Sequence, residues 1–225
     1  MGQLLLVRHG QASFGSDDYD VLSGLGERQA ELLGRSLAAR GTTPAALLHG
    51  QMVRQRRTAQ ILAEASGWDA SPECDVDWDE MDHLEVLSRH PAPSDDPSPR
   101  EFQAWFEAAT ERWIAGETDD YTESFEAFTR RVVAALERAA DRAADRAADR
   151  AADRDGDVVV VTSGGPVSWV VTHLLSAGTD TYRRLAPVVV NTGVTKVVTG
   201  RRGLTLVSFN DHAHLEAEPA LLTYR

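Results

Sequence analysis

Polar residues that can do chemistry follow a short apolar segment near the start of the chain. Residues 4–10 read Leu-Leu-Leu-Val-Arg-His-Gly. Four apolar residues between glycines are typical of a buried parallel strand, and open α/β sheets bind ligands at the carboxyl ends of such strands. Arg8 offers a planar fork of donors that suits phosphate, and His9 can act as a base or a nucleophile. The stretch predicts an anion site; a strand end that merely carries polar residues is the alternative.

A cluster of cations follows the next apolar segment, residues 45–49. It contains Arg54, Arg56 and Arg57 at the start of a helix predicted over residues 52–66. Helix starts carry free N–H groups and partial positive charge, so cations are unfavourable there unless an anion is present. The cluster therefore predicts an anion site with Arg54 closest to the strand end, although Arg56 and Arg57 also fit an exposed helical face.

A third candidate segment follows the strongest predicted strand, residues 158–161, which are all valine. It reads Thr-Ser-Gly-Gly over residues 162–165, and a helix is predicted to begin near Pro166. This arrangement leaves backbone N–H groups, among them that of Gly164, available to an anion. Ser163 also stands in a strand-turn-helix elbow, which raises a serine hydrolase as a further hypothesis. The elbow pattern Gly-x-Ser-x-Gly, however, has Val161 in place of its first glycine.

The elements around these segments alternate between strands and helices. Helices are predicted over residues 28–40, capped by Ser23, over 52–66, and from a capping box at 98–101 to about 115, and two edge strands over 191–197 and 204–209. The opening order predicts an α/β fold with a mostly parallel central sheet and helices on both faces, a three-layer sandwich. With 225 residues and 42% hydrophobic content, the chain is expected to form a single domain over residues 1–225.

Two segments depart from this pattern. Residues 84–122 combine a proline-rich stretch with the aromatic helix that begins near Ser98, and we interpret them as a helical insertion. Residues 137–155 carry the repeat Arg-Ala-Ala-Asp, which favours helix but drifts around a helix of 3.6 residues per turn. These repeats are predicted to form a low-complexity, solvated helical extension in which each arginine pairs with the aspartate three residues on.

Composition excludes several classes of partner. The formal net charge of −12 argues against nucleic acid, which is bound by clustered cations. The longest apolar runs are too short for a membrane span, and Cys74 is the single cysteine, which excludes an internal disulfide and suits a reducing compartment. We therefore expect a cytoplasmic protein with no nucleic-acid or membrane partner.

The motifs resemble those of the histidine phosphatase superfamily, whose members resemble phosphoglycerate mutase. The matching residues, in order and spacing, are Leu-Val-Arg8-His9-Gly10-Gln11, Leu22-Ser23-x-x-Gly26-x-x-Gln29-Ala30 and Arg54-x-x-x-Thr58-Ala59. The resemblance implies a phosphoglycerate mutase-like fold in which His9 forms a phosphohistidine while Arg8 and Arg54 grip the phosphoryl group. It also implies that residues 84–122 act as a lid that sets substrate choice.

The same resemblance implies an acid that protonates the leaving oxygen, within the segment Trp-Asp-Glu-Met-Asp over residues 78–82. By position we assign Glu80, with Asp79 and Asp82 as the competing candidates. A solvated acidic loop without a catalytic role is the remaining interpretation.

The chain departs from the family at residue 163. The family normally has Ser-His-Gly-Gly where this chain has Thr-Ser-Gly-Gly, so Ser163 replaces the second pocket histidine. A hydroxyl can still donate a hydrogen bond to a phosphoryl oxygen, but it carries no charge, which disfavours a mutase more than a phosphatase. Among the other histidines, we expect His173 to pack against the sheet, weigh His212 as a substitute, and place His214 in the family's closing Asn-Asp-x-x-His-Leu tail.

These observations predict a phosphoric monoester hydrolase that needs no metal and no cofactor. Its partner would be a small phosphorylated substrate or inorganic phosphate, and a homodimer is left open. The catalytic residues are expected to be His9 and Glu80, and the substrate-binding residues Arg8, Arg54, Ser163, Gly164 and Gln11. The alternative is a catalytically weakened or inactive phosphate-binding or regulatory protein on the same fold.

Overall fold

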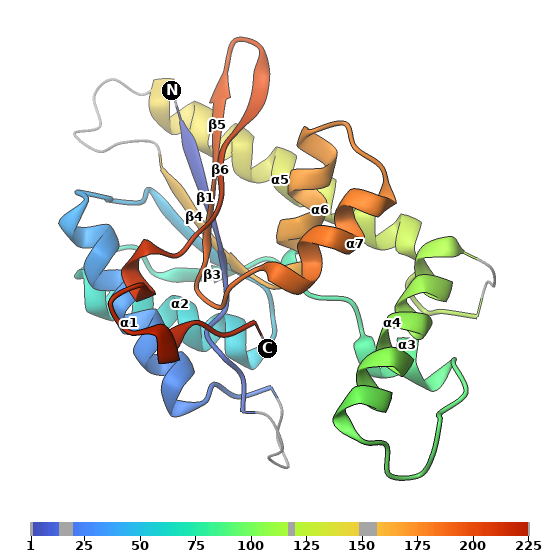
Figure 1. The fold of residues 1–225 in the computed structure, drawn as a ribbon. Helices are drawn as coiled ribbons and strands as arrows, with labels where there is room; N and C mark the ends of the chain where they lie inside the picture. Colours follow the sequence, from blue (N-terminus) through green and yellow to red (C-terminus); the bar gives the residue numbers. More distant parts are fainter. Residues whose placement is uncertain (1, 14–19, 117–119, 149–156, 225) are drawn as a thin grey trace. The chain divides into compact units, whose positions relative to one another are not determined.

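A computed structural model describes residues 2–13, 20–116, 120–148 and 157–224 (Figure 1). The strands are β1 (Gln3–Arg8), β2 (Ala46–His49), β3 (Pro72–Cys74), β4 (Val158–Thr162), β5 (Val194–Gly200) and β6 (Gly203–Asp211). The helices are α1 (Gly24–Ala39), α2 (Val53–Ser66), α3 (His83–Ser88), α4 (Pro99–Ala115), α5 (Phe125–Ala148), α6 (Gly164–Leu174) and α7 (Thr179–Leu185). No helix within these ranges is both long and apolar enough to cross a membrane.

The strands form one sheet in the order β3-β2-β4-β1-β5-β6. β3, β2, β4 and β1 are parallel to one another, and β5 and β6 add an antiparallel hairpin beside β1. The prediction of two edge strands is wrong for β5, because this strand pairs with β1 on one side and with β6 on the other. Within the described residues, β6 and β3 are the edges.

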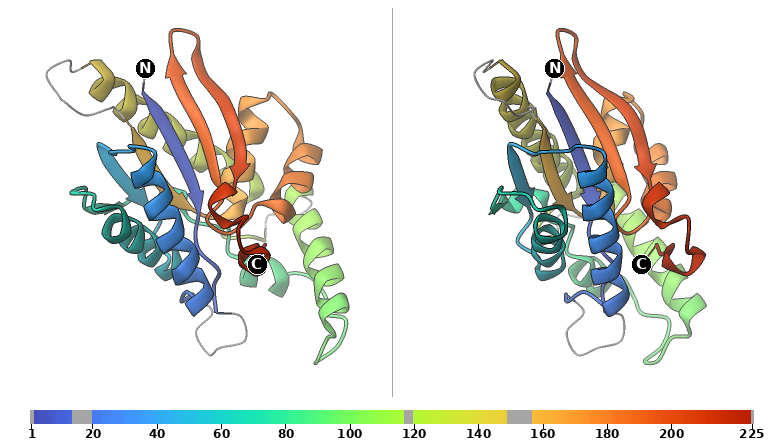
Figure 2. Two further views of the ribbon diagram at one scale, coloured as in Figure 1. Left: turned by 60° about the vertical axis from the view of Figure 1, so that its left-hand side comes forward. Right: turned by 90° about the vertical axis from the view of Figure 1, so that its left-hand side faces the viewer.

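Helices cover both faces of the sheet (Figures 1 and 2). α1 and α2 pack on one face, and α6 and the second half of α5 lie on the other. The layer under α1 and α2 is an apolar cluster that includes Leu5, Val7, Leu33, Leu37, Leu47, Leu62, Val159 and Val161. Because side chains alternate along a strand, the fully buried Leu4, Leu6, Val158 and Val160 face the second layer. The predicted three-layer α/β fold with a mostly parallel sheet is confirmed.

The register of the central strands aligns their carboxyl ends. Arg8, the last residue of β1, is paired with Thr162, the last residue of β4. His49 at the end of β2 is paired with Val161. The residues that follow these strands, His9 and Ser163 among them, therefore leave the sheet side by side.

The chain divides into two compact units, Met1–Glu80 with Val132–Arg225, and Met81–Arg131. The smaller unit contains α3, α4 and the start of α5. The ring of Trp113 lies 5.1 Å from that of Phe125 and 5.4 Å from that of Phe128, centroid to centroid. The predicted capping box is confirmed, with Ser98 and Glu101 bonded reciprocally at the start of α4. The insertion expected over residues 84–122 falls inside this unit, and its role as a lid stays a prediction.

The Arg-Ala-Ala-Asp repeats form the second half of α5 as far as Ala148, and residues 149–155 lie outside the described residues. The predicted helix is confirmed, but the prediction that it is solvated is wrong for its first turns, since Ala139, Ala140 and Ala143 are buried. A Cβ atom on Gly2 would lie only 2.4 Å from the carbonyl oxygen of Ala143. The small alanine side chains let this helix pack directly on the start of β1.

The arginines of the repeats pair with acids on the segment around β3. Arg138 lies 3.0 Å from Asp75 and 2.7 Å from Asp77, and Arg142 lies 2.7 Å from Glu73. The predicted pairing with the aspartate three residues on is therefore wrong for Arg138. These pairs are partly exposed, and each contributes about 0–1 kcal/mol.

Two glycines of α1 differ in how closely their surroundings pack, although both lie in the first turn of the helix. A Cβ atom on Gly26 would lie 2.1 Å from the carbonyl oxygen of Gln11, whereas one on Gly24 would meet nothing within 4 Å. We expect Gly26→Ala to lower the free energy of unfolding by about 1–3 kcal/mol through overpacking. Gly24→Ala should change it by less than about 1 kcal/mol. Urea unfolding of the two variants measures this difference, and equal losses would contradict it.

Candidate active site

His9 is held by its backbone from two sides of the sheet. Its N–H donates to the carbonyl oxygen of Thr162 at 2.8 Å, and its carbonyl oxygen accepts from the amide Nδ2 of Asn191 at 3.1 Å. Asn191 is itself fixed, because its Oδ1 accepts from the hydroxyl of Thr223 at 2.9 Å. The imidazole is 5% exposed. The side chain is therefore rigidly placed at the carboxyl end of β1.

The hydrogen bonds of the His9 ring define its tautomer. Nδ1 lies 2.7 Å from the carbonyl oxygen of Gly10, which can only accept, so Nδ1 carries the proton. Nε2 is then the bare nitrogen, and it accepts from Nε of Arg54 at 3.1 Å. Burial, together with the positive charges of Arg54 and Arg8, holds the pKa of His9 well below its ordinary value of 6.5. The ring is neutral at pH 7, with a nucleophilic lone pair on Nε2.

Arg54 is buried and is fixed by a carboxylate that the motifs do not indicate. Its Nη1 lies 2.7 Å from Oδ1 of Asp20. The other oxygen of Asp20 accepts from the backbone N–H of Val53 at 2.8 Å. Met52, the N-cap residue of α2, supplies no side-chain cap, so Asp20 takes that place. The arginine cluster predicted an anion at this helix start, and Asp20 of the chain itself is one such anion.

Arg8 lies near His9 but is partly engaged with the backbone of distant segments. Its Nη1 donates to the carbonyl oxygens of Val189 and, at 2.9 Å, of Tyr224. A Cβ atom built on Gly164 would be 3.7 Å from Nε of Arg8, so this guanidinium also lies beside the start of α6. Its charge contributes to the lowered pKa of His9. Arg8, His9 and Arg54 are thus brought together rather than scattered.

Ser163 follows β4 and is 1% exposed. Its Oγ accepts from the amide Nε2 of Gln55 at 2.9 Å. An amide cannot remove the proton of a serine hydroxyl, whereas a nucleophilic serine needs an adjacent base. The contact gives no support to the serine hydrolase hypothesis. Gly164, the next residue, begins α6.

Glu80 is the candidate acid that contacts the segment after β4. Its Oε2 accepts from the backbone N–H of Gly165 at 2.8 Å. Asp79 instead accepts from the backbone N–H of Gln51 at 2.7 Å, and Asp82 caps the start of α3. The geometry therefore favours Glu80 over both competing residues, because among these three described carboxylates only that of Glu80 contacts the start of α6 beside Ser163.

Gln11 supports the start of α1. Its Oε1 accepts from the hydroxyl of Ser23 at 3.0 Å, and Ser23 caps the helix by accepting from Gly26. The backbone N–H of Gln11 donates to Oε1 of the fully buried Gln29 at 2.9 Å. The structure thus gives Gln11 a structural contact, and its predicted role toward substrate stays a prediction.

The three other histidines considered from the sequence lie away from this role. His173 is exposed, so the prediction that it packs against the sheet is wrong; it lies on the outer side of α6. Nδ1 of His212 lies 2.7 Å from the carbonyl oxygen of Asn210. Nε2 of His214 lies 2.9 Å from Oγ1 of Thr192, and burial lowers its pKa to about 4.

Two contributors were missed by sequence reasoning, Asp20 and Gln55. Each acts through a partner on another part of the chain, Asp20 through Arg54 and Gln55 through Ser163. Asp20 follows a polar loop in which four acidic or aromatic residues offered no way to choose among them, and Gln55 reads as an ordinary helical residue. No local signal marks either. In the described part of the chain, no group of three or more His, Cys, Asp or Glu side chains could hold a metal ion.

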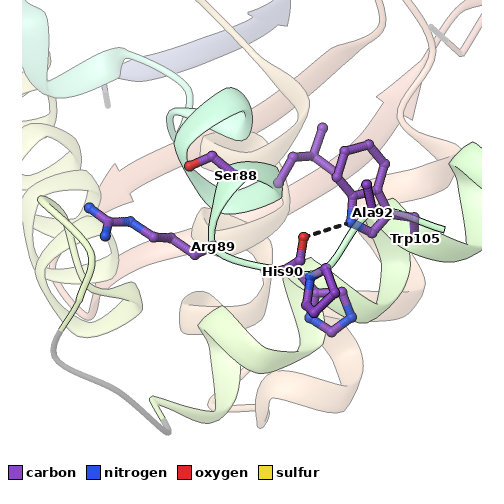
Figure 3. Close-up of a pocket in the computed structure, with 7 residues that line it drawn as sticks. Ser88, Arg89, His90, Ala92 and Trp105 are labelled. Carbon is purple, nitrogen blue, oxygen red and sulfur yellow. Dashed lines mark hydrogen bonds between the residues drawn. The ribbon is translucent and has the colours of Figure 1, made fainter. Parts of the chain in front are cut away.

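The smaller unit contains an open pocket of its own, of about 550 Å³. It is lined by Leu87, Ser88, Arg89, His90, Pro91, Ala92 and Trp105, and Nε1 of Trp105 donates to the carbonyl oxygen of His90 at 3.1 Å (Figure 3). The volume falls within the range of small-molecule sites. All of these residues belong to the segment predicted to set substrate choice.

A model of the histidine phosphatase superfamily (branch 1) matches residues 4–212, a range that carries His9, Arg54, Glu80 and Ser163. The chain belongs to this superfamily. No sequence among the curated proteins matches it.

Several solved structures share the fold. A phosphoserine phosphatase variant from Entamoeba histolytica, in complex with phosphoserine, is 18% identical with a TM-score of 0.64, over 96% of this chain and 100% of that chain. A mycobacterial glucosyl-3-phosphoglycerate phosphatase in complex with VO3 is 20% identical with a TM-score of 0.65, over 93% and 99%. The phosphoglycerate mutase of Bacillus anthracis is 20% identical with a TM-score of 0.62, over 96% and 95%.

The lowered pKa of His9 can be tested by NMR. In the folded protein we expect its imidazole to stay neutral as the pH falls through 6.5, because burial and two guanidinium groups oppose a further positive charge. The same residue in the urea-unfolded chain should titrate near the ordinary value of about 6.5. Ring signals assigned by comparison with His9→Ala would report both states. A folded-state titration of His9 at or above 6.5 would contradict this assignment.

Proposed function

We propose that this protein is a phosphoric monoester hydrolase that uses His9 as its nucleophile on a small phosphorylated molecule. One observation carries the proposal: a buried, neutral imidazole whose bare Nε2 is held at 3.1 Å by the guanidinium of Arg54. A nitrogen of this kind can attack phosphorus, and the guanidinium beside it can then bind the phosphoryl oxygens.

In the first step, Nε2 of His9 forms a bond to phosphorus while the ester P–O bond breaks. Glu80 gives its proton to the leaving oxygen, so that an alcohol departs. Arg54 transfers its Nε hydrogen bond from His9 to the phosphoryl group, and together with Arg8 it offsets the charge on the equatorial oxygens. The proton on Nδ1, held by the Gly10 carbonyl oxygen, lets the ring take up positive charge.

In the second step, water attacks the phosphorus of the phosphohistidine. The Glu80 carboxylate accepts the proton of that water, and the P–N bond breaks to restore neutral His9 and to release inorganic phosphate. The backbone N–H of Gly164, at the start of α6, is suited to an oxygen of the phosphoryl group, whereas the N–H of Gly165 already donates to Glu80. Membership of the histidine phosphatase superfamily supports this assignment of roles.

The alternative function is phosphate binding or regulation without significant turnover. The observation that favours it is Ser163, a neutral hydroxyl at the place where a charged donor would stabilise the transferred group more strongly. Under this alternative, inorganic phosphate would raise the melting temperature although no monoester on a broad panel is hydrolysed. Turnover of any panel member that is lost with His9 would exclude it.

The role of His9 is tested by His9→Ala, with His173→Ala as the matched control. We expect His9→Ala to lower kcat by about 10³-fold or more, since it removes the group that forms the covalent intermediate. His173 is exposed on α6, so its variant should retain wild-type kcat. Steady-state hydrolysis of para-nitrophenyl phosphate measures both. Unchanged turnover in His9→Ala would overturn the proposal.

A further inference from the structure

Ser163 occupies the N-cap position of α6 but does not cap it. An N-cap serine normally accepts a hydrogen bond from a backbone N–H in the first turn of its helix. Here the side chain of Ser163 makes no such bond, and the N–H of Gly165 donates to Glu80 instead. Because Glu80 accepts from this N–H, the Ser163 hydroxyl is not needed as the cap of α6.

Gln55 donates a hydrogen bond to the oxygen of that hydroxyl. Its Nε2 lies 2.9 Å from Oγ of Ser163 and 3.3 Å from the carbonyl oxygen of Trp78. A carbonyl oxygen can only accept, so the atom of Gln55 that faces Trp78 is the nitrogen, and its second hydrogen points to Ser163. Gln55 is fully buried, which restricts the amide to this arrangement.

The Ser163 hydroxyl proton is consequently directed away from Gln55. Oγ accepts from the amide, and among the described residues no acceptor takes the proton of Ser163. His9 and Ser163 leave neighbouring strands side by side, since the N–H of His9 donates to Thr162 at 2.8 Å. Ser163 therefore follows β4 directly beside His9, which follows β1.

This orientation leaves one polar atom of Gln55 without a hydrogen bond within the described part of the chain. Its Oε1 is buried and has no hydrogen-bond partner among the described residues. A Cβ atom on Gly50 would lie 2.1 Å from this oxygen, so Oε1 packs closely against the backbone of Gly50. Flipping the amide would place Oε1 next to the carbonyl oxygen of Trp78. Two acceptor oxygens repel each other, because neither carries a proton to donate. The donor end of Gln55 thus stays on Ser163.

We propose that Gln55 is a positioning residue that orients the Ser163 hydroxyl as a donor to a phosphoryl oxygen bound beside His9. The inference rests on the proposed function for the place of the phosphoryl group. It adds that the Gln55 amide and the Ser163 hydroxyl, both uncharged, act together at the position where members of the superfamily normally have a second histidine.

A double-mutant cycle tests the pair with para-nitrophenyl phosphate as substrate. Gln55→Met keeps the length of the side chain but removes the donor, and Ser163→Ala removes the hydroxyl. Each single change should lower kcat/KM by roughly tenfold, the value of one hydrogen bond to a charged group. Because Gln55 acts through Ser163, the double variant should be no slower than Ser163→Ala. Gln60→Met, on the exposed side of α2, is the matched control and should match wild type.

Two results would overturn the inference. The first is wild-type kcat/KM in Gln55→Met. The second is a loss in the Ser163→Ala background as large as the loss in the wild-type background, which would mean that Gln55 merely supports the fold. If Gln55→Met does not fold, Gln55→Leu replaces it, since its shorter apolar side chain likewise cannot donate to Ser163. The difference between its effects in the two backgrounds then reports the coupling.

Failure of the proposed function gives a different pattern. If the wild-type protein hydrolyses no monoester, the same cycle is measured on the affinity for orthovanadate by calorimetry. Coupled losses of affinity for Gln55→Met and Ser163→Ala would support the positioning role although hydrolysis is absent. Additive losses, or none, would overturn it.

Discussion

The neutral state of His9 is the constraint on which the site depends. A single proton on Nδ1, bound to the carbonyl oxygen of Gly10, leaves Nε2 bare and faces it toward Arg54. Gly10 is in turn tied to α2, because its N–H donates to Oγ1 of Thr58 at 3.1 Å. A Cβ on Gly10 would lie 2.4 Å from the carbonyl oxygen of Gly26, so only glycine allows this approach. The motif residues Gly10, Gly26 and Thr58 thus hold the His9 ring in the orientation that turns Nε2 toward Arg54.

The charges next to the His9 ring are positive, whereas the net charge of the chain is negative. The chain carries a net charge of −12, yet Arg8 and Arg54 place two cations next to a buried imidazole. Asp20 offsets one of them and fixes its direction. Two guanidinium groups thus meet at a buried imidazole although the chain as a whole is acidic, and a small positive region of this kind suits a compact anion.

The sequence allowed prediction wherever a segment carries its own signal. The apolar runs of β1, β2 and β4, the capping box at Ser98 and the polar residues after the strands all depend on neighbours along the chain. β3, with three residues, is too short to show a period, and α7 has only two turns. Asp20 and Gln55 escaped notice because their partners lie on other elements. The burial of Ala143 was missed because its repeat has no apolar seam, and small side chains instead let this part of the helix approach β1.

The Arg8 contacts have a consequence for how the molecule is made. Arg8 belongs to the first strand, but the carbonyl groups that hold its Nη1 come from residues 181 and 216 positions later. Contacts of such long sequence separation form slowly, because a large loop must close before they add stability. A chain that ends before Val189 already contains both guanidinium groups and the imidazole, but it lacks the carbonyl groups that hold Arg8. The guanidinium of Arg8 is therefore fixed beside His9 only after the segments that carry Val189 and Tyr224 have joined the first strand.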